Sequence, residues 1–264
     1  MGKYRFDEKY FAKAPTVNFH LHDNYEIYYF LMGDANYYVE GNIYTLEKGD
    51  ILLTNDKELH APVFHNNDGY ERIFISVPKD YLSEFVTDTF HPMDCFEKRR
   101  LGEKNKIDHR LVKACGIDKH IAEIKKYSTE EMPESEAMIK CHLMLMLHAF
   151  HEILQISDET GGRQGKMQSV VEYINKHLED DLSLTQLGKV FYLNKYYLAH
   201  CFKNETGFTI GDYIAKKRIL LARELLSEGI SSLEVAGRVG YSEYSSFYRA
   251  FKKITGKSPR ALKK

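Results

Sequence analysis

The sequence has no tryptophan, no C-x-x-C pair and no apolar run near the ~20 residues needed to cross a bilayer. Its four widely spaced cysteines favour reduced, structural thiols in a cytosolic protein: Cys95, Cys115, Cys141 and Cys201. The first residues are charged and lack an apolar stretch, and Phe6 does not fit a myristoylation motif. These absences predict a cytoplasmic protein without membrane attachment.

Signatures of several enzyme classes are also missing. The sequence has no Gly-rich phosphate-binding loop, no G-x-S-x-G and no Cys-His zinc spacing. The stretch GGRQGK (residues 161–166) lacks both the Ser or Thr and the preceding strand that a phosphate-binding loop needs. We therefore expect neither an enzyme of these classes nor a bound cofactor.

Charge is distributed unevenly, although the formal net charge is only −1. From Arg163 to the end there are 18 Lys and Arg against 10 Asp and Glu, a net +8. The rest of the chain then carries 19 against 28, a net −9. A basic back half behind an acidic front half indicates a polyanionic partner for the back half alone.

The order of residue patterns predicts two domains. Short apolar runs separated by Gly, Asn and Asp turns over residues 15–78 are typical of a β-sandwich or barrel. Residues 108–127 and 134–156 have helical spacing, and the second segment is so apolar that it must pack on the barrel, on another subunit or on both. Residues 157–166 are polar and Gly-rich, which indicates a linker, and the remainder is helical in pattern.

The back half repeats itself at an offset of 49 residues. Eight of 29 aligned positions are identical, including Tyr192 with Tyr241, Phe202 with Phe251, Lys203 with Lys252 and Gly207 with Gly256. Each copy reads as a short helix, a tight turn and a longer helix, which is a helix-turn-helix. In the second copy we expect Ser232 and Ser242 to cap the two helices.

In such a unit the start of the second helix presents its outward side chains to DNA bases, and basic residues further along contact phosphates. The candidate DNA-binding residues are Lys195, Tyr196, Ala199, His200 and Lys203 in the first copy, and Tyr244, Ser245, Tyr248, Arg249, Lys252 and Lys253 in the second. The alternative is a protein-binding helical module whose outward residues face solvent. Two copies and a net +8 favour DNA.

A second constellation lies in FHLHDNYE (residues 19–26). Because side chains alternate along a strand, its two histidines and its glutamate share one face, and a later histidine can approach from the opposite wall. Three imidazoles and a carboxylate suit Zn, Fe, Mn or Ni, but with neighbouring tyrosines they equally suit a small polar ligand. A third interpretation is a pairing that only satisfies buried polar atoms. The candidate effector-binding residues are His20, His22, Glu26, Tyr28, Tyr38 and His60.

Residues 167–264 resemble the DNA-binding domain of AraC-type transcriptional regulators, most specifically over GYSEYSSFYRAFKKITGKSPRAL (residues 240–262). The resemblance implies two helix-turn-helix units joined by a long helix at about residues 210–227. Residues 15–80 resemble the cupin-like sensor domain of that family, through the His-x-His-x-x-x-Glu run and a Gly-Asp pair followed by His60, although NDKELH lacks the usual Pro-x-Gly. The first copy departs from the second at two positions: Phe191 stands where the second copy has Gly240, and His200 stands where it has Arg249. They predict a different first turn and weaker or different DNA reading by the first copy.

The sequence as a whole predicts an α+β protein of two domains. Residues 1–156 would form a cupin-like β-barrel with a helical hairpin, and residues 167–264 an all-α double helix-turn-helix. The resemblance implies a non-catalytic regulator of promoter DNA that responds to a small polar effector such as a sugar and contacts RNA polymerase if it is an activator. The apolar surface of residues 134–156 predicts a homodimer through helices within residues 107–156. The alternative is a metal-dependent cupin enzyme fused to a helical module, with His20, His22, Glu26 and His60 as ligands.

Overall fold

The chain divides into two compact units, Met1–Gln164 and Gly165–Lys264, in the computed structural model. The structure describes residues 4–15, 17, 20, 22–130, 132–156 and 167–262. The linker expected at residues 157–166 lies outside these described residues. Each unit has a hydrophobic core of its own.

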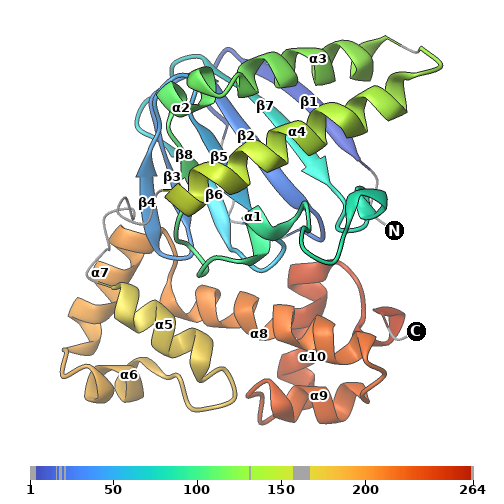
Figure 1. The fold of residues 1–264 in the computed structure, drawn as a ribbon. Helices are drawn as coiled ribbons and strands as arrows, with labels where there is room; N and C mark the ends of the chain where they lie inside the picture. The colour runs from blue at the N-terminus through green and yellow to red at the C-terminus, as the bar shows by residue number, and fades with distance from the viewer. Residues whose placement is uncertain are drawn as a thin grey trace. The chain divides into compact units, whose positions relative to one another are not determined.

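Strands of the first unit form two antiparallel sheets (Figure 1), with the order β1-β7-β2-β5-β8 in the larger and β4-β3-β6 in the smaller. The strands are β1 (Arg5–Phe11), β2 (Tyr25–Met32), β3 (Ala35–Val39), β4 (Asn42–Thr45), β5 (Ile51–Thr54), β6 (His60–Phe64), β7 (Tyr70–Val77) and β8 (Lys106–Ile107). An isolated bridge joins His20 to His60. Within the described residues the sheets are not closed into a barrel, so the expected barrel is replaced by two open sheets.

Side chains of β2 point alternately to the two faces of the larger sheet, and each face is covered by a hydrophobic core. Tyr25 and Ile27 point to the helices, whereas Tyr28 and Phe30 join the residues that lie between the two sheets. The strand is therefore buried on both sides, which explains its nearly continuous apolar sequence, YEIYYFLM.

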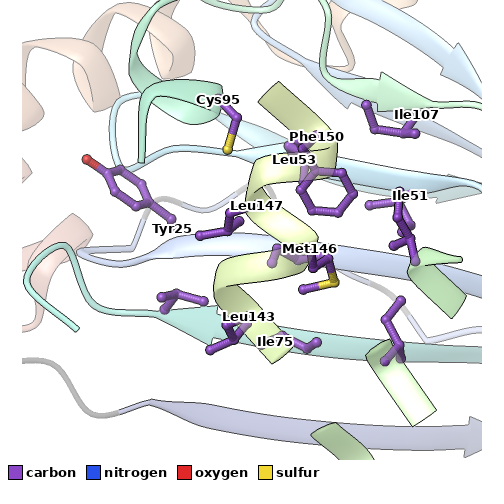
Figure 2. Packing of buried hydrophobic residues seen from close by; sticks show 14 of the residues in the cluster. Tyr25, Ile51, Leu53, Ile75, Cys95, Ile107, Leu143, Met146, Leu147 and Phe150 are labelled. Atoms are coloured by element: carbon purple, nitrogen blue, oxygen red, sulfur yellow. The ribbon is translucent and has the colours of Figure 1, made fainter. Parts of the chain in front are cut away.

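Helices cover the outer face of the larger sheet (Figures 1 and 2). They are α1 (Asp94–Glu97), α2 (His109–Ala114), α3 (Ile117–Thr129) and α4 (Ser135–Ile156), with a short 3-10 turn, η1 (Ser83–Phe85). Leu143, Met146, Leu147 and Phe150 of α4 are completely buried against the strands. The single helix expected over residues 108–127 is two helices, because Gly116, in the left-handed conformation at φ 68°, interrupts the helical backbone between α2 and α3.

Helix α4 is long and apolar enough to cross a membrane by length and composition. Its buried side chains nevertheless belong to the core shared with the sheet, as is typical of a core helix in a globular domain. The opposite side of α4 exposes Cys141, His148 and Leu145, the last at 52 %.

The cysteines are free thiols in different surroundings. Cys95 packs in the first core, where burial raises the pKa of its thiol to about 12, so it is a structural residue. Cys115 and Cys141 are exposed, so the expectation of structural thiols does not hold for these two.

The second unit is helical throughout its described residues. Its elements are α5 (Gln168–Lys176), α6 (Leu184–Val190), α7 (Lys195–Thr206), α8 (Ile210–Ser227), α9 (Ser232–Arg238), α10 (Tyr244–Thr255) and the 3-10 turn η2 (Pro259–Leu262). Helix α8 has the bounds expected from the sequence and runs from the first helix-turn-helix copy to the second (Figure 1). Thr209 caps it by accepting a hydrogen bond from the backbone N–H of Asp212.

Candidate ligand pocket and nucleic-acid interface

Four side chains converge between the two sheets of the first unit. The ligating atoms of His20, His22, Glu26 and His60 all lie within 4.8 Å of one another. The strand pairing explains this, because His20 bridges to His60 at the start of β6 while Glu26 lies on β2 in the larger sheet. Glu26 and His60 are fully buried, at 2 % and 0 % exposure.

The second ring nitrogens of His22 and His60 face Glu26 in this cluster. His60 Nδ1 lies 2.8 Å from the carbonyl of Glu58, and His22 Nδ1 lies 2.7 Å from the carbonyl of Asn24. Because a carbonyl only accepts, each Nδ1 must donate, and in a neutral ring Nε2 then keeps a lone pair. These two Nε2 atoms are 3.2 Å apart, and His60 Nε2 is 3.4 Å from Glu26 Oε2.

Three acceptors facing one another repel unless a proton, a cation or hydrogen-bond donors lie between them. The pKa values of His22 and Glu26 reflect this need for a proton or a cation between the acceptors. Burial by itself lowers the pKa of His22, but its contact with Glu26 outweighs burial and the pKa is raised. Burial likewise raises the pKa of Glu26, but hydrogen bonds to His22 and His60 overcome it and the pKa is lowered. A metal ion of the Zn, Fe, Mn or Ni type fits the same donor set.

Beside the cluster lies a cavity of about 130 Å³. Its walls are aromatic and apolar with three polar side chains: Phe11, Pro15, Val17, His20, Glu26, Tyr28, Tyr37, Pro62, Tyr70, Arg72 and Phe74. It is small beside the ~300–1,000 Å³ of ordinary ligand sites, so it suits a compact ligand. Arg72 is held at the wall by Asp7 of β1, with Nη2 2.9 Å from Oδ2.

The structure brings together most of the effector residues expected from the sequence. His20, Glu26 and Tyr28 line the cavity, whereas His22 and His60 belong to the adjoining cluster and Tyr38 to neither. Its neighbour on β3, Tyr37, points inward instead, with its hydroxyl 3.4 Å from Glu26 Oε1. The tyrosine that faces the cavity is thus one residue earlier than expected, and neighbouring side chains on a strand point to opposite faces of the sheet. Sequence reasoning also missed Arg72, because nothing local marks β7 as a wall of the same cavity.

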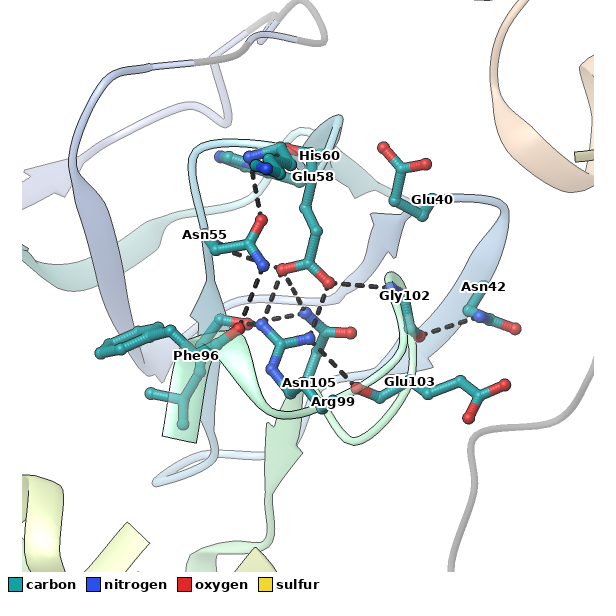
Figure 3. Close-up of polar contacts among 12 residues, drawn as sticks. Glu40, Asn42, Asn55, Glu58, His60, Phe96, Arg99, Gly102, Glu103 and Asn105 are labelled. Atoms are coloured by element: carbon teal, nitrogen blue, oxygen red, sulfur yellow. Dashed lines mark hydrogen bonds and ion pairs between the residues drawn. The ribbon is translucent and has the colours of Figure 1, made fainter. Parts of the chain in front are cut away.

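A buried ion pair supports the backbone that orients His60 (Figure 3). Arg99 Nη1 and Nη2 each lie 2.6 Å from a carboxylate oxygen of Glu58. Asn105 Nδ2 donates to Glu58 Oε2 at 3.0 Å, and the backbone N–H of Gly102 donates to Oε1 at 2.8 Å. This network, unseen in the sequence analysis, fixes the residue whose carbonyl holds His60 Nδ1.

Another acidic group, Asp50 with Asp108 and His109, also has metal-ligand spacing. Lys106 Nζ already lies 2.6 Å from Asp50 Oδ2, and the backbone N–H of His109 donates to Asp50 Oδ1 at 2.8 Å. Its charge is therefore compensated by the protein, and it is a weaker candidate.

In the second unit the second helix of each helix-turn-helix copy, α7 and α10, exposes polar and basic side chains. The exposed candidates are Lys195, Tyr196, His200 and Lys203 on α7, and Ser245, Arg249, Lys252 and Lys253 on α10. Ala199, Tyr244 and Tyr248 are half-buried. The Tyr244 hydroxyl bonds to Ser232 at 3.2 Å and its ring packs on Phe247, so this tyrosine supports the core as well as the surface. Sequence reasoning passed over Tyr192 and Tyr197, which are 96 % and 52 % exposed.

The two copies differ in their turns, as the substitution of Phe191 for Gly240 predicts. Ser183 caps α6 and Ser231 caps α9, an offset of 48, whereas α7 and α10 begin 49 residues apart. The second turn therefore has one additional residue. The left-handed position is Gly240 in the second copy and Tyr192 in the first, at φ 80° and 53°.

The expected caps of the second copy are each displaced by one residue. Ser231, and not Ser232, accepts a hydrogen bond from the backbone N–H of Glu234. Glu243 occupies the cap position of α10 in place of Ser242, and its side chain makes no capping bond. A run of small hydroxyl residues offers several caps of similar strength, so the sequence does not fix which is used.

Comparisons with known proteins agree with this geometry. Residues 8–147 match the AraC-like ligand binding domain, and residues 187–264 match a helix-turn-helix domain. An uncharacterised HTH-type transcriptional regulator of Staphylococcus aureus (strain COL) is 24% identical over 237 residues, covering 87% of this chain and 30% of that protein. The probable transcriptional regulator LumQ of Photobacterium leiognathi is 34% identical over 107 residues, 40% of this chain and 43% of LumQ.

Among solved structures, the DNA-binding domain of AdpA in complex with a target DNA is 26% identical, with a TM-score of 0.36, covering 37% of this chain and 88% of that one. The chain spans about 30% of the length of the S. aureus relatives. These relatives are transcriptional regulators, not enzymes.

Proposed function

Since the chain belongs to the AraC family of transcriptional regulators, we propose that it binds promoter DNA sequence-specifically through α7 and α10 under the control of a small effector. The observation that supports this most is the pair of exposed, partly basic helices mounted on α8. At 18 residues and about 1.5 Å per residue, α8 is about 27 Å long. That length suits two helices placed in successive major grooves, roughly 34 Å apart.

A selection from random duplex DNA tests this function. The full chain should enrich one family of sequences with two short conserved blocks about one helical turn apart. Enrichment that responds only to salt, without a shared sequence, would contradict specific recognition. Genomic sites that match the enriched sequence would identify the neighbouring genes and hence the class of effector.

The effector we propose is a compact molecule that offers several hydrogen-bond donors, for which a small sugar or other polyol is the leading candidate. Glu26 and His60 are buried beside this cavity, and hydroxyl groups, which both donate and accept, suit a carboxylate and imidazole nitrogens. Aromatic walls from Tyr28 and Tyr37 suit the apolar face of a sugar ring. A divalent cation is the second candidate, because the same acceptors form a metal-ligand set.

A thermal-shift screen of the full chain with sugars, polyols and divalent cations tests the pocket. A ligand at 100 times its Kd stabilises the native state by ~2.7 kcal/mol. His60→Ala and Glu26→Gln should abolish the shift, whereas Tyr38→Phe, which changes a tyrosine outside the cavity, should retain it. A shift that survives both pocket variants would place the effector elsewhere.

We further propose that the protein acts in the cytoplasm as a homodimer through the outer side of α4, and contacts RNA polymerase if it activates transcription. The apolar residue Leu145 is 52 % exposed there, beside Cys141. Effector binding would then shift the population between two dimer arrangements, of which one fits the promoter. Sedimentation of Leu145→Glu should show a monomer, whereas Lys119→Glu on α3 should still dimerise.

A further inference from the structure

A cleft of about 890 Å³ separates the two helix-turn-helix copies within the second unit. Its lining comes from three segments: residues 179–183 before α6, the part of α8 that includes Arg218, and the turn after α9 with Gly240 and Tyr241. The copies are thus joined by α8 but are not packed tightly across this opening. A rigid connecting helix alone does not prevent each copy from pivoting where it meets that helix.

One side chain in the cleft touches both copies. Arg218 donates from Nε to the carbonyl of Leu178 at 2.9 Å and from Nη2 to the carbonyl of Asp180 at 2.7 Å, both in the segment before α6. Its guanidinium carbon lies 5.5 Å from the ring centroid of Tyr241, which follows α9. The planar fork of arginine serves two acceptors and an aromatic face together, which a lysine ammonium cannot do.

The backbone of the second turn is fitted to the same contact. At Gly240 a Cβ atom would lie 2.5 Å from Arg218 Nη2 and 2.5 Å from the Leu178 carbonyl oxygen. Only a residue without a side chain permits this approach, and its φ of +80° favours glycine as well. The turn after α9 therefore rests directly on the arginine and on the segment that the arginine holds.

We propose that Arg218 is a positioning residue that fixes the orientation of α10 relative to α7, and thereby the spacing of DNA blocks that the protein accepts. This inference rests on the proposed DNA-binding function. One additional base pair between the blocks moves the second groove by about 3.4 Å and rotates it by about 34–36°. A clamped pair of helices cannot follow that change, whereas a pair that pivots about α8 can.

The test uses the full chain and DNA enriched by the wild type. Affinity is measured for the enriched duplex, for one with an extra base pair between the blocks, and for one that keeps a single block. The variants are Arg218→Met, which removes the fork, Arg218→Lys, which keeps one charge, and Arg223→Met, a matched control on α8 outside the cleft.

The wild type should prefer the enriched spacing on the order of tenfold over the lengthened one. Arg218→Met should reduce this preference to about threefold or less while single-block affinity stays within about twofold of wild type. Arg218→Lys should fall between them, and Arg223→Met should match the wild type. If Arg218→Met is unfolded by circular dichroism, Arg218→Lys carries the comparison.

Two results would overturn the inference alone: a spacing preference unchanged in both Arg218 variants, or an equal loss on all three duplexes, which would make Arg218 a phosphate contact or a general stabiliser. Failure of the wild type to enrich any DNA would instead overturn the proposed function, and this inference with it.

Discussion

Replacing Arg99 by methionine should destabilise the β-rich unit more than any surface change, because it leaves a buried carboxylate without its partner. Arg99 and Glu58 are 3% and 0% exposed in their side chains, and both carboxylate oxygens contact the guanidinium at 2.6 Å. Loss of one partner of a buried pair costs about 3–5 kcal/mol. Three donors to Glu58 remain, from Asn55, Gly102 and Asn105, so we expect about 3 kcal/mol.

The loss should depend on pH in a defined direction. In the wild type, burial alone raises the pKa of Glu58, but the charge of Arg99 and the hydrogen bonds outweigh it and hold the pKa below its usual value. The carboxylate therefore stabilises the fold above its unfolded pKa of about 4.3, and this contribution is lost as the pH falls through the lowered native pKa. Without Arg99 the native pKa should rise above the unfolded value, so the deficit of the variant should shrink as the pH falls from 7 to about 4.5.

This effect is measured by urea unfolding, with hydrogen exchange of peptides from β5 and β6 as the probe of the β-rich unit, since the chain lacks tryptophan as a fluorescence probe. The double variant Glu58→Gln with Arg99→Met should recover about 1–2 kcal/mol and lose the pH dependence, because the uncompensated charge is gone. A single-variant cost below about 1 kcal/mol that is equal at pH 7 and pH 5 would refute the reasoning.

Three further predictions concern single residues. Arg249→Ala should reduce the free energy of DNA binding by about 1–3 kcal/mol and relax the preference at one base pair. Lys252→Ala should instead weaken binding to all DNA sequences alike and lower the slope of log affinity against log salt by about one, as a salt series would measure. Phe150→Ala should destabilise the β-rich unit by about 3–5 kcal/mol in urea unfolding, because a fully buried ring leaves a cavity. Gly240→Ala should lower the melting temperature of the helical unit by circular dichroism, since the substituted residue is strained at about 1–3 kcal/mol and collides with its neighbours.

Local patterns in the sequence predicted what neighbouring residues determine. The bounds of α8 were implied by the resemblance to AraC-type regulators and are correct; the structure adds that Thr209 caps its start. The approach of His22 to Glu26 was predicted, but not for the right reason, because β2 begins at Tyr25 and His22 precedes the strand. Long-range pairings could not be predicted: β1, with its alternating charges, became an edge strand only through β7, over sixty residues away.

The predictions of a closed barrel and of Tyr38 as a pocket residue differ from the structure for related physical reasons. Whether two sheets close depends on the pairing of their edges, which the composition of a strand does not specify. The side of β3 that faces the cavity depends on register, and there Tyr37 and Tyr38 are chemically equivalent candidates. The pair of Arg99 with Glu58 lay beyond prediction because its members are separated by 41 residues and neither belongs to a motif.

The left-handed turn residue has different consequences in the two copies of the repeat. Tyr192 holds this position in the first copy and is 96 % exposed, so asparagine or glycine, which suit the left-handed conformation, should replace it without a collision. Gly240 holds it in the second copy against Arg218 and Leu178, where every side chain collides. A saturation library should therefore accept several residues that suit the left-handed conformation at the first turn, with β-branched residues depleted, and glycine alone at the second.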